Sequence, residues 1–144
     1  MTFTEQKGDV FDFTDTHALV HCISADFSMS GGIAVPIARK FNLRPALQSI
    51  ANKTIGQLLP FPSCQYVNGV LNLISKKYVY QKPTYPNLHS VLVSMRKCIE
   101  DNDIEKIVMP YIGCGIDRLS WHLVRKLILT SMHDLDLKIV AVYL

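Results

Sequence analysis

The sequence lacks the features that mark a membrane or secreted protein. No apolar run is long enough to cross a bilayer, and the first nine residues are polar, without the apolar core of a signal peptide. The four cysteines (Cys22, Cys64, Cys98 and Cys114) are far apart and form no CxxC pair. This spacing predicts reduced thiols rather than a disulfide framework. We therefore expect an intracellular protein, in the cytoplasm or nucleus, with no membrane partner.

Charge is also scarce. Only 19% of the 144 residues are charged, the net charge is +3, and lysine and arginine are scattered without a block of like charges. Nucleic-acid binding needs a stronger basic footprint, so we expect no nucleic-acid partner, whereas a mild positive charge suits a small anionic ligand. Because 49% of the residues are hydrophobic, we predict one globular domain over residues 1–144. Because it shows no interface signal, we expect a monomer.

Strand-like and helix-like stretches alternate along the chain. Ala18–Ile23 is a near-continuous apolar run, typical of a strand buried on both faces. We predict strands at 2–6, 18–23, 57–61, 65–67, 70–75, 104–110 and 137–143, and helices at 33–41, 45–52, 87–101 and 121–133. Ser120 is the expected cap of the last helix, and Asn68-Gly69 is the expected hairpin turn. This order predicts an α/β sandwich around a mixed, largely parallel sheet, with ligands beyond the carboxyl ends of the strands.

The stretch from Ile107 to Arg118 carries the strongest functional signal. It predicts a buried strand that ends at Pro110, then the loop Gly113-Cys114-Gly115-Ile116, and then Asp117. Two glycines one residue apart let the backbone approach a ligand and turn its N–H groups toward phosphate oxygens. A carboxylate beside such a loop serves acid–base chemistry better than phosphate binding. The stretch therefore predicts a pyrophosphate or nucleotide-sugar site at which a carboxylate takes part in a reaction.

A second glycine pair, Gly31-Gly32, follows another buried strand and opens a helix. Alone, such a pair is usually only a turn, but two glycine loops at the ends of two strands provide room for two phosphates. Their spacing fits neither GxGxxG nor a P-loop. This argues against a dinucleotide-dependent dehydrogenase and against a kinase.

Other side chains near strand ends are weaker candidates. Lys76 and Lys77 end a strand, and since side chains alternate across a strand, at most one of them points into a given cleft. The residues alone leave open a solvated pair, a phosphate contact or an amine nucleophile. Cys114 is typical of a small hydrophobe in a loop. His17 and His21 are four residues apart, but His21 lies in a predicted strand, so we expect no metal site.

Six motifs occur in order along the chain: Lys7-Gly8-Asp9-Val10-Phe11, His21–Asp26, Met29–Ala34, Ser75-Lys76-Lys77, Lys82–Tyr85 and Met109–Leu119. As an ordered set they resemble the macrodomain family, and within it the terminal ADP-ribose protein glycohydrolase branch. The resemblance implies a compact α/β/α sandwich with a cleft for ADP-ribose and no cofactor or metal. It covers nearly the whole chain, although residues 42–69 resemble the family poorly.

The resemblance assigns residues to parts of the ligand. Asp9 would bind the adenine amino group, beside the Val10 backbone and Leu144. Ser24 and the Gly31-Gly32-Ile33 loop would line the distal ribose and the phosphates, and the backbone N–H groups of Gly113–Ile116 would wrap the pyrophosphate and the distal ribose. The full expected ADP-ribose site is Asp9, Val10, Ser24, Gly31, Gly32, Ile33, Ser75, Pro110, Gly113, Cys114, Gly115, Ile116 and Leu144.

The resemblance also implies a reaction. Lys76 matches the nucleophile that attacks the anomeric carbon of the distal ribose and forms a covalent lysyl–ADP-ribose adduct, and Asp117 matches the acidic partner that resolves it. The implied substrates are proteins ADP-ribosylated on Glu or Asp and, by similar ester chemistry, O-acetyl-ADP-ribose. Two alternatives remain: a module that binds ADP-ribose without hydrolysis, and a phosphatase for ADP-ribose-1″-phosphate. The presence of both Lys76 and Asp117 disfavours the binding module.

Overall fold

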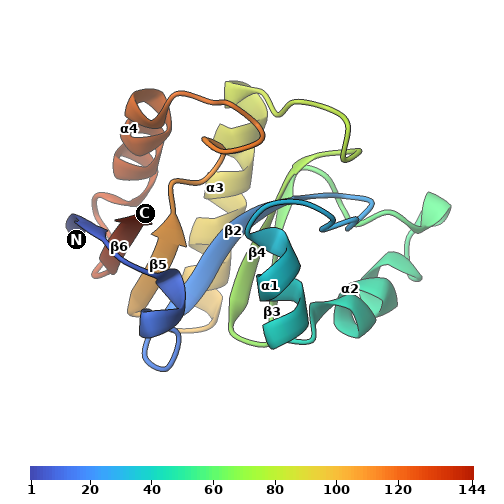
Figure 1. The fold of residues 1–144 in the computed structure, drawn as a ribbon, viewed down its shortest axis with the longest axis horizontal. Coiled ribbons are helices and arrows are strands. Elements are labelled where there is room, and N and C mark those ends of the chain that lie inside the picture. The colour runs from blue at the N-terminus through green and yellow to red at the C-terminus, as the bar shows by residue number, and fades with distance from the viewer.

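The computed structural model describes all of residues 1–144, which form three layers, with helices on both faces of one sheet (Figure 1). Six strands pair in the order β1-β6-β5-β2-β4-β3, all parallel except β3 against β4. The strands are β1 (Thr2–Lys7), β2 (Ala18–Ser24), β3 (Ser63–Val67), β4 (Val70–Lys76), β5 (Lys106–Pro110) and β6 (Lys138–Tyr143). The helices are α1 (Ala34–Lys40), α2 (Leu43–Ala51), α3 (Tyr85–Asp101) and α4 (Trp121–Met132), with short 3-10 helices η1 (Val10–Phe13) and η2 (Ile55–Gln57). The predicted α/β sandwich with a mixed, largely parallel sheet is confirmed.

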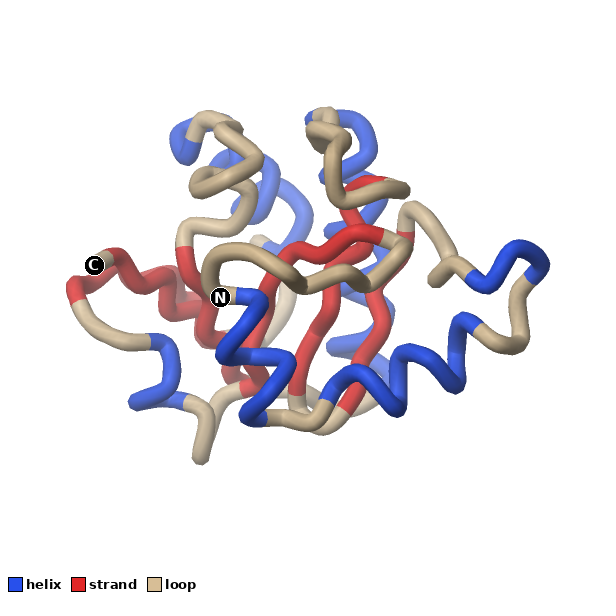
Figure 2. Tube along the Cα trace, turned by 45° about the vertical axis from the view of Figure 1, so that its right-hand side comes forward, coloured by secondary structure: helices blue, strands red, loops and turns tan.

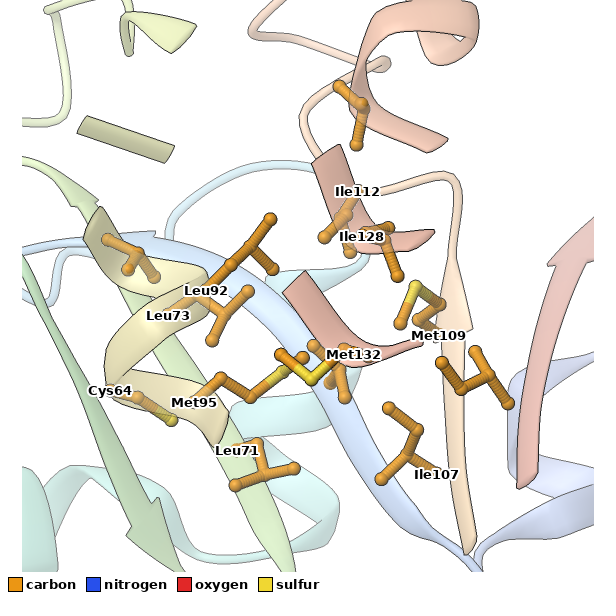
Figure 3. Packing of buried hydrophobic residues seen from close by; sticks show 14 of the residues in the cluster. Cys64, Leu71, Leu73, Leu92, Met95, Ile107, Met109, Ile112, Ile128 and Met132 are labelled. Carbon is orange, nitrogen blue, oxygen red and sulfur yellow. The ribbon is translucent and has the colours of Figure 1, made fainter. Parts of the chain in front are cut away.

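Each inner strand contributes to two hydrophobic cores, because its side chains alternate between the two faces of the sheet. On β2, Val20 packs with residues of α3 and α4, whereas Leu19 and Ile23 pack with residues of α1 and α2. Figure 3 shows the first of these cores, in which Met95 of α3 and Met132 of α4 lie against side chains of the sheet. The sheet is thus buried on both faces, as its apolar strands predict.

The two long helices begin in different ways. α3 starts two residues earlier than predicted, because Thr84 accepts a hydrogen bond from the Asn87 N–H at 3.2 Å and Pro86 fits the first turn. Ser120 does precede α4, but its hydroxyl makes no cap hydrogen bond. Its N–H instead donates to the Tyr85 hydroxyl at 2.9 Å, which ties the start of α4 to the start of α3. None of the helices combines the length and apolar character needed to span a membrane.

The predicted strand over residues 57–61 is wrong. The chain there leaves η2 and continues without regular structure up to β3. Gly56 and Gln57 have φ values of +83° and +55°, in the left-handed region that an extended strand excludes. Leu59 is buried and its N–H donates to the Ala25 carbonyl at 2.9 Å, a single contact in place of a strand ladder.

The sheet topology brings three loops to one edge. β2, β4 and β5 are parallel neighbours, so the β2–α1 loop (25–33), the β4–α3 loop (77–84) and the β5–α4 loop (111–120) all follow carboxyl ends of strands (Figure 2). Parallel α/β sheets bind their ligands at this edge.

Candidate active site

A cavity opens where two neighbouring strands of the sheet separate. β2 pairs with β5 only at Ala18–Ile107 and Leu19–Val108, although both strands continue beyond these pairs. The carboxyl-terminal half of β2 and the end of β5 at Pro110 line a cavity of about 780 Å³. This volume is typical of small-molecule sites, and the cavity lies at the predicted edge of the sheet.

A β-bulge at the end of β4 places Lys76 in the cavity wall. Ile23 pairs with Ile74, but the next residue of β2, Ser24, pairs with Lys76, so Ser75 is an extra residue in the ladder. Ser75 is buried and lies outside the cavity lining, whereas Lys76 and Ser24 line the cavity. The bulge therefore decides which side chain of this segment faces the ligand.

Lys76 forms an ion pair with Asp117 inside the cavity. Its Nζ donates to Asp117 Oδ1 at 2.7 Å, and the two side chains are only 10% and 14% exposed. Removing two charges from water is costly, so such a pair is weak evidence for stability and points more to a functional site. Lys77 is exposed and directed elsewhere, with its Nζ 5.7 Å from the centre of the Tyr78 ring. The structure thus brings together the predicted lysine and carboxylate and excludes Lys77 from the cavity lining.

The β5–α4 loop is closed by its own backbone. Gly113 has φ +73°, and a methyl group there would lie 2.9 Å from Leu119 Cδ1. The Leu119 N–H donates to the Gly113 carbonyl at 2.7 Å. The Cys114 N–H donates to the Tyr111 carbonyl at 3.2 Å, and Cys114 lies outside the cavity lining, whereas Gly115 lines it. Two of the three predicted positions in the Gly-Cys-Gly motif therefore face the cavity.

The β2–α1 loop is held by side chains outside the cavity. Asp26 Oδ1 accepts a hydrogen bond from the Ser24 hydroxyl and, at 3.4 Å, one from the Ser28 N–H. Asp26 Oδ2 accepts from the Val79 N–H at 3.1 Å, which joins this loop to the β4–α3 loop. Arg44 of α2 donates to a backbone carbonyl of the same loop at 3.1 Å. The loop therefore has a fixed shape.

The two glycine loops meet over the cavity. A methyl group at Gly31 or Gly32 would lie 3.1 Å or 3.3 Å from Ile116 Cδ1, so the missing side chains leave space for Ile116. Ile116 is 70% exposed and, like Ile33, lines the cavity. Ala34, which follows Ile33, is the first residue of α1, and no side chain caps the first turn of this helix.

The opposite end of the cavity lies beyond the carboxyl ends of β1 and β6, which are neighbours because the two strands pair in parallel, with Lys7 beside Tyr143. Asp9 caps η1, with its Oδ1 accepting from the Phe11 N–H at 2.9 Å. Val10 is buried, whereas Leu144 is exposed, and all of these residues line the cavity. Every predicted site residue therefore lines one cavity, with the exception of Ser75 and Cys114.

Sequence reasoning missed His21 as a residue of the cavity wall. The Asn72 amide nitrogen donates to the backbone carbonyls of Gln65 and Val70, so its oxygen faces His21 Nε2 at 2.7 Å and that nitrogen carries the proton. Burial lowers the pKa of His21 to about 4, so the ring is neutral. A polar residue in an apolar strand, paired in register with a polar residue on the next strand, is the signal that marks this position.

Cys22 and Cys114, the two cysteines nearest Lys76 and the β5–α4 loop, are poor nucleophiles. All four are free, and burial raises the pKa of Cys22 to about 12 and that of Cys114 to about 11, so both thiols are protonated at neutral pH. No group of three His, Cys, Asp or Glu side chains is arranged to hold a metal ion. Lys76 carries the one amine among the side chains that line the cavity.

Comparison with known proteins agrees with this geometry. A family model described as Macro domain matches residues 20–128. The human protein named ADP-ribose glycohydrolase OARD1 is 37% identical over 139 residues, which cover 94% of this chain and 88% of that protein.

Among solved structures, the macrodomain of Mycobacterium tuberculosis DarG matches with a TM-score of 0.86 at 20% identity, covering 98% of this chain and 97% of that chain. Thermosipho africanus DarTG, described in complex with ADP-ribose, matches with a TM-score of 0.83 at 17% identity, covering 100% of this chain and 42% of that chain. These two matches concern the fold alone. The family model and the similarity to OARD1 establish that the chain belongs to the macro domain family.

Proposed function

We propose that this macrodomain is an ADP-ribosyl hydrolase that releases ADP-ribose from modified Glu or Asp side chains. The observation that carries the proposal is the ion pair between Lys76 and Asp117 at 2.7 Å in the cavity wall. A protein that only binds ADP-ribose needs loops around the phosphates, but it has no use for a buried amine beside a carboxylate. Relatives that are 37% identical over most of their length are named ADP-ribose glycohydrolase, which supports the same activity.

The first chemical step uses both side chains. Asp117 is placed to accept a proton from the Lys76 ammonium, because its Oδ1 already accepts the Nζ hydrogen bond. The amine then attacks the anomeric carbon of the distal ribose. The Nζ–C bond forms, the C–O bond to the substrate side chain breaks, and the Glu or Asp carboxylate leaves with the bonding electron pair, while the proton passes from Asp117 to solvent. The product is a covalent lysyl–ADP-ribose adduct.

The second step uses the Asp117 carboxylate as a base. It takes a proton from the water that attacks the anomeric carbon and passes that proton to Lys76 Nζ as the N–C bond breaks. This restores the ion pair and releases ADP-ribose. One nucleophile and one carboxylate therefore serve both halves of the reaction without a metal or cofactor.

The remaining cavity residues hold the ligand in this proposal. Backbone N–H groups of the loops at Gly31-Gly32 and Gly113–Ile116 bind the phosphates and the distal ribose. Asp9 and Leu144 lie at the adenine end, away from Lys76. We also propose that O-acetyl-ADP-ribose is a substrate, because its ester resembles that of modified Glu, and that the protein acts as an intracellular monomer.

The test is release of ADP-ribose from a Glu-modified protein by the wild type and by Lys76→Ala, with Lys126→Ala, an exposed residue of α4, as the control. We expect loss of at least about 100-fold in Lys76→Ala and no change in Lys126→Ala. Undiminished activity in Lys76→Ala would contradict the mechanism. Binding of ADP-ribose by the wild type without turnover would indicate a binding module, and phosphate release from ADP-ribose-1″-phosphate alone would indicate the phosphatase.

The adduct provides an independent test. In Asp117→Ala at alkaline pH, hydroxide can take the proton from Lys76 in place of Asp117, so the adduct still forms. Its hydrolysis is slow, because the carboxylate that activates the water is missing. Mass spectrometry of this variant after incubation with modified protein should find one ADP-ribose on Lys76. The same mass increase in the double variant Lys76→Arg/Asp117→Ala would contradict the assignment of the nucleophile.

A further inference from the structure

Half of the chain contains no carboxylate. All 12 Asp and Glu residues lie in residues 1–26 or 100–144, whereas residues 27–99 carry none. That stretch holds nine of the 15 basic residues: Arg39, Lys40, Arg44, Lys53, Lys76, Lys77, Lys82, Arg96 and Lys97. It builds α1, α2, β3, β4 and α3, which occupy the centre and right of Figure 1. The small net charge therefore conceals an uneven distribution of charge along the chain, although Lys76, Arg96 and Lys97 are paired with carboxylates from residues 100–144.

The β4–α3 loop, which contains Lys77 and Lys82, reaches the cavity wall. It begins directly after Lys76, and its Val79 lines the cavity. The rings of Tyr78 and Tyr80 are stacked, with centroids 5.6 Å apart and planes at 2°, and Tyr80 is 80% exposed. Exposed aromatic side chains grouped together are uncommon on a protein surface and mark sites of interaction.

Side-chain hydrogen bonds hold the backbone of the loop that displays these side chains. The Val79 N–H donates to Asp26, and the Tyr78 N–H donates to the Gln81 side chain at 2.9 Å. Lys77 and Lys82 are both exposed and form no ion pair within the chain. The loop thus presents two unpaired cations beside a stacked tyrosine pair, next to the candidate nucleophile.

We propose that the β4–α3 loop docks the acidic polypeptide segment around the modified Glu or Asp of a protein substrate. The inference rests on the proposed function, because the bond to be broken then lies at Lys76 Nζ. The polypeptide on the far side of that bond must leave the cavity near Lys76, and Lys77 to Lys82 are the residues that follow it in the chain. Carboxylates flanking the modified residue would pair with Lys77 and Lys82, and the tyrosine pair would contact the peptide backbone and apolar side chains.

A single-stranded nucleic acid is the competing occupant, because it also binds cations and aromatic rings. The observations favour a polypeptide for two reasons. The tyrosine rings stack on each other, so their shared faces are closed to a base. The leaving group of the proposed reaction is also a side-chain carboxylate, which belongs to a protein.

Two substrates separate docking from catalysis. One is a protein ADP-ribosylated on Glu within an acidic segment, and the other is O-acetyl-ADP-ribose, which has no polypeptide. For Lys77→Glu/Lys82→Glu at low ionic strength we expect KM for the modified protein to rise about tenfold or more, with kcat/KM for O-acetyl-ADP-ribose within about twofold of the wild type. Tyr80→Ala should produce a smaller change of the same kind. Lys53→Glu/Lys126→Glu is the control, since it makes the same change in charge at exposed positions outside the loop and the cavity lining.

An equal loss on both substrates, an equal loss in the control variant, or no loss on the modified protein would overturn the docking proposal. If the wild type hydrolyses neither substrate, the proposed function fails, and docking is then measured directly. The probe is a fluorescent glutamate-rich peptide, whose anisotropy should rise with the wild type and not with Lys77→Glu/Lys82→Glu. A single-stranded oligonucleotide of equal charge that competes more strongly than the unlabelled peptide would also overturn the proposal.

Discussion

The two glycine loops at the cavity are built in different ways. The β2–α1 loop is held by side chains outside the cavity, chiefly Asp26 and Arg44, which bind its backbone and that of the β4–α3 loop. The β5–α4 loop is held by its own backbone and by the left-handed conformation of Gly113. Each loop carries one Asp, but Asp117 lines the cavity and Asp26 does not. We infer that the first loop provides shape and the second provides chemistry.

The largest expected effect comes from removing the negative charge of Asp117. In Asp117→Asn the proposed base is lost, so hydrolysis of the modified protein should fall by about 10²–10⁴-fold. The amide is of nearly the same size, so affinity for ADP-ribose should stay within about threefold of the wild type. Parallel measurement of kcat and of ADP-ribose affinity by calorimetry checks both. A variant that binds weakly but hydrolyses at the normal rate would assign Asp117 to binding and remove the contrast between the loops.

The second largest effect concerns His21 in β2, the strand that leads into the β2–α1 loop. The pKa of His21 is lowered from an ordinary 6.5 to about 4, chiefly because the ring is buried. Between these values the unfolded chain binds a proton that the folded protein does not. The contribution of neutral His21 to the free energy of unfolding is therefore fully present above pH 6.5. It should fall by about 3 kcal/mol as the pH drops to 4.

Urea unfolding at a series of pH values measures this loss. His21→Asn should remove most of the pH dependence in this window, whereas His89→Asn, an exposed residue of α3, should retain it. If the free energy of unfolding of His21→Asn changes with pH as steeply as that of the wild type, the other titrating groups of the chain account for acid destabilisation. The comparison is between slopes, so a lower absolute stability of the His21 variant does not affect it.

Gly113 and Gly115 allow a matched test within the β5–α4 loop. Gly113 has φ +73° and a methyl group there would lie 2.9 Å from Leu119 Cδ1, whereas a methyl group at Gly115 would have no atom within 4 Å. Gly113→Ala should cost about 1–3 kcal/mol of stability and weaken ADP-ribose binding, since the loop must shift to accept it. Gly115→Ala should keep the stability, as measured by thermal unfolding. Equal effects of the two substitutions would mean that the backbone of this loop is more adaptable than its hydrogen bonds indicate.

The sequence predicted the sheet because its strands are continuous apolar runs and its long helices have regular apolar spacing. It also placed the two lysines and Asp117 at or after the ends of predicted strands, whereas the pairing of Lys76 with Asp117 came from the family resemblance. The choice of Lys76 from spacing alone was not possible, since it depends on the bulge at Ser75 and no residue pattern marks that bulge. The assignment came from the family resemblance instead.

The differences between the predicted and the observed arrangement have a common physical cause. Residues 57–61 are apolar enough for a strand, but the left-handed conformations at Gly56 and Gln57 direct the chain away from the sheet. Ser75 and Cys114 stand in motifs that face the cavity, yet the bulge and the loop hydrogen bonds direct them elsewhere. Backbone conformation at single residues decided each case, and such conformations depend on tertiary contacts that local sequence does not contain.

The smallest expected effect tests the role assigned to the β2–α1 loop. Asp26→Asn replaces an oxygen that accepts hydrogen bonds by an amide nitrogen that cannot, so at least one donor among Ser24, Ser28 and Val79 loses its partner. A lost hydrogen bond to a half-buried charged acceptor should cost about 1–2 kcal/mol of stability, while kcat at saturating substrate should change by less than about threefold, because Asp26 does not line the cavity. Asp15→Asn, at an exposed residue outside the site, is the control for the change in charge. If Asp26→Asn instead lowers kcat as strongly as Asp117→Asn without loss of stability, the β2–α1 loop takes part in the chemistry, and the distinction between a loop that provides shape and a loop that provides chemistry is wrong.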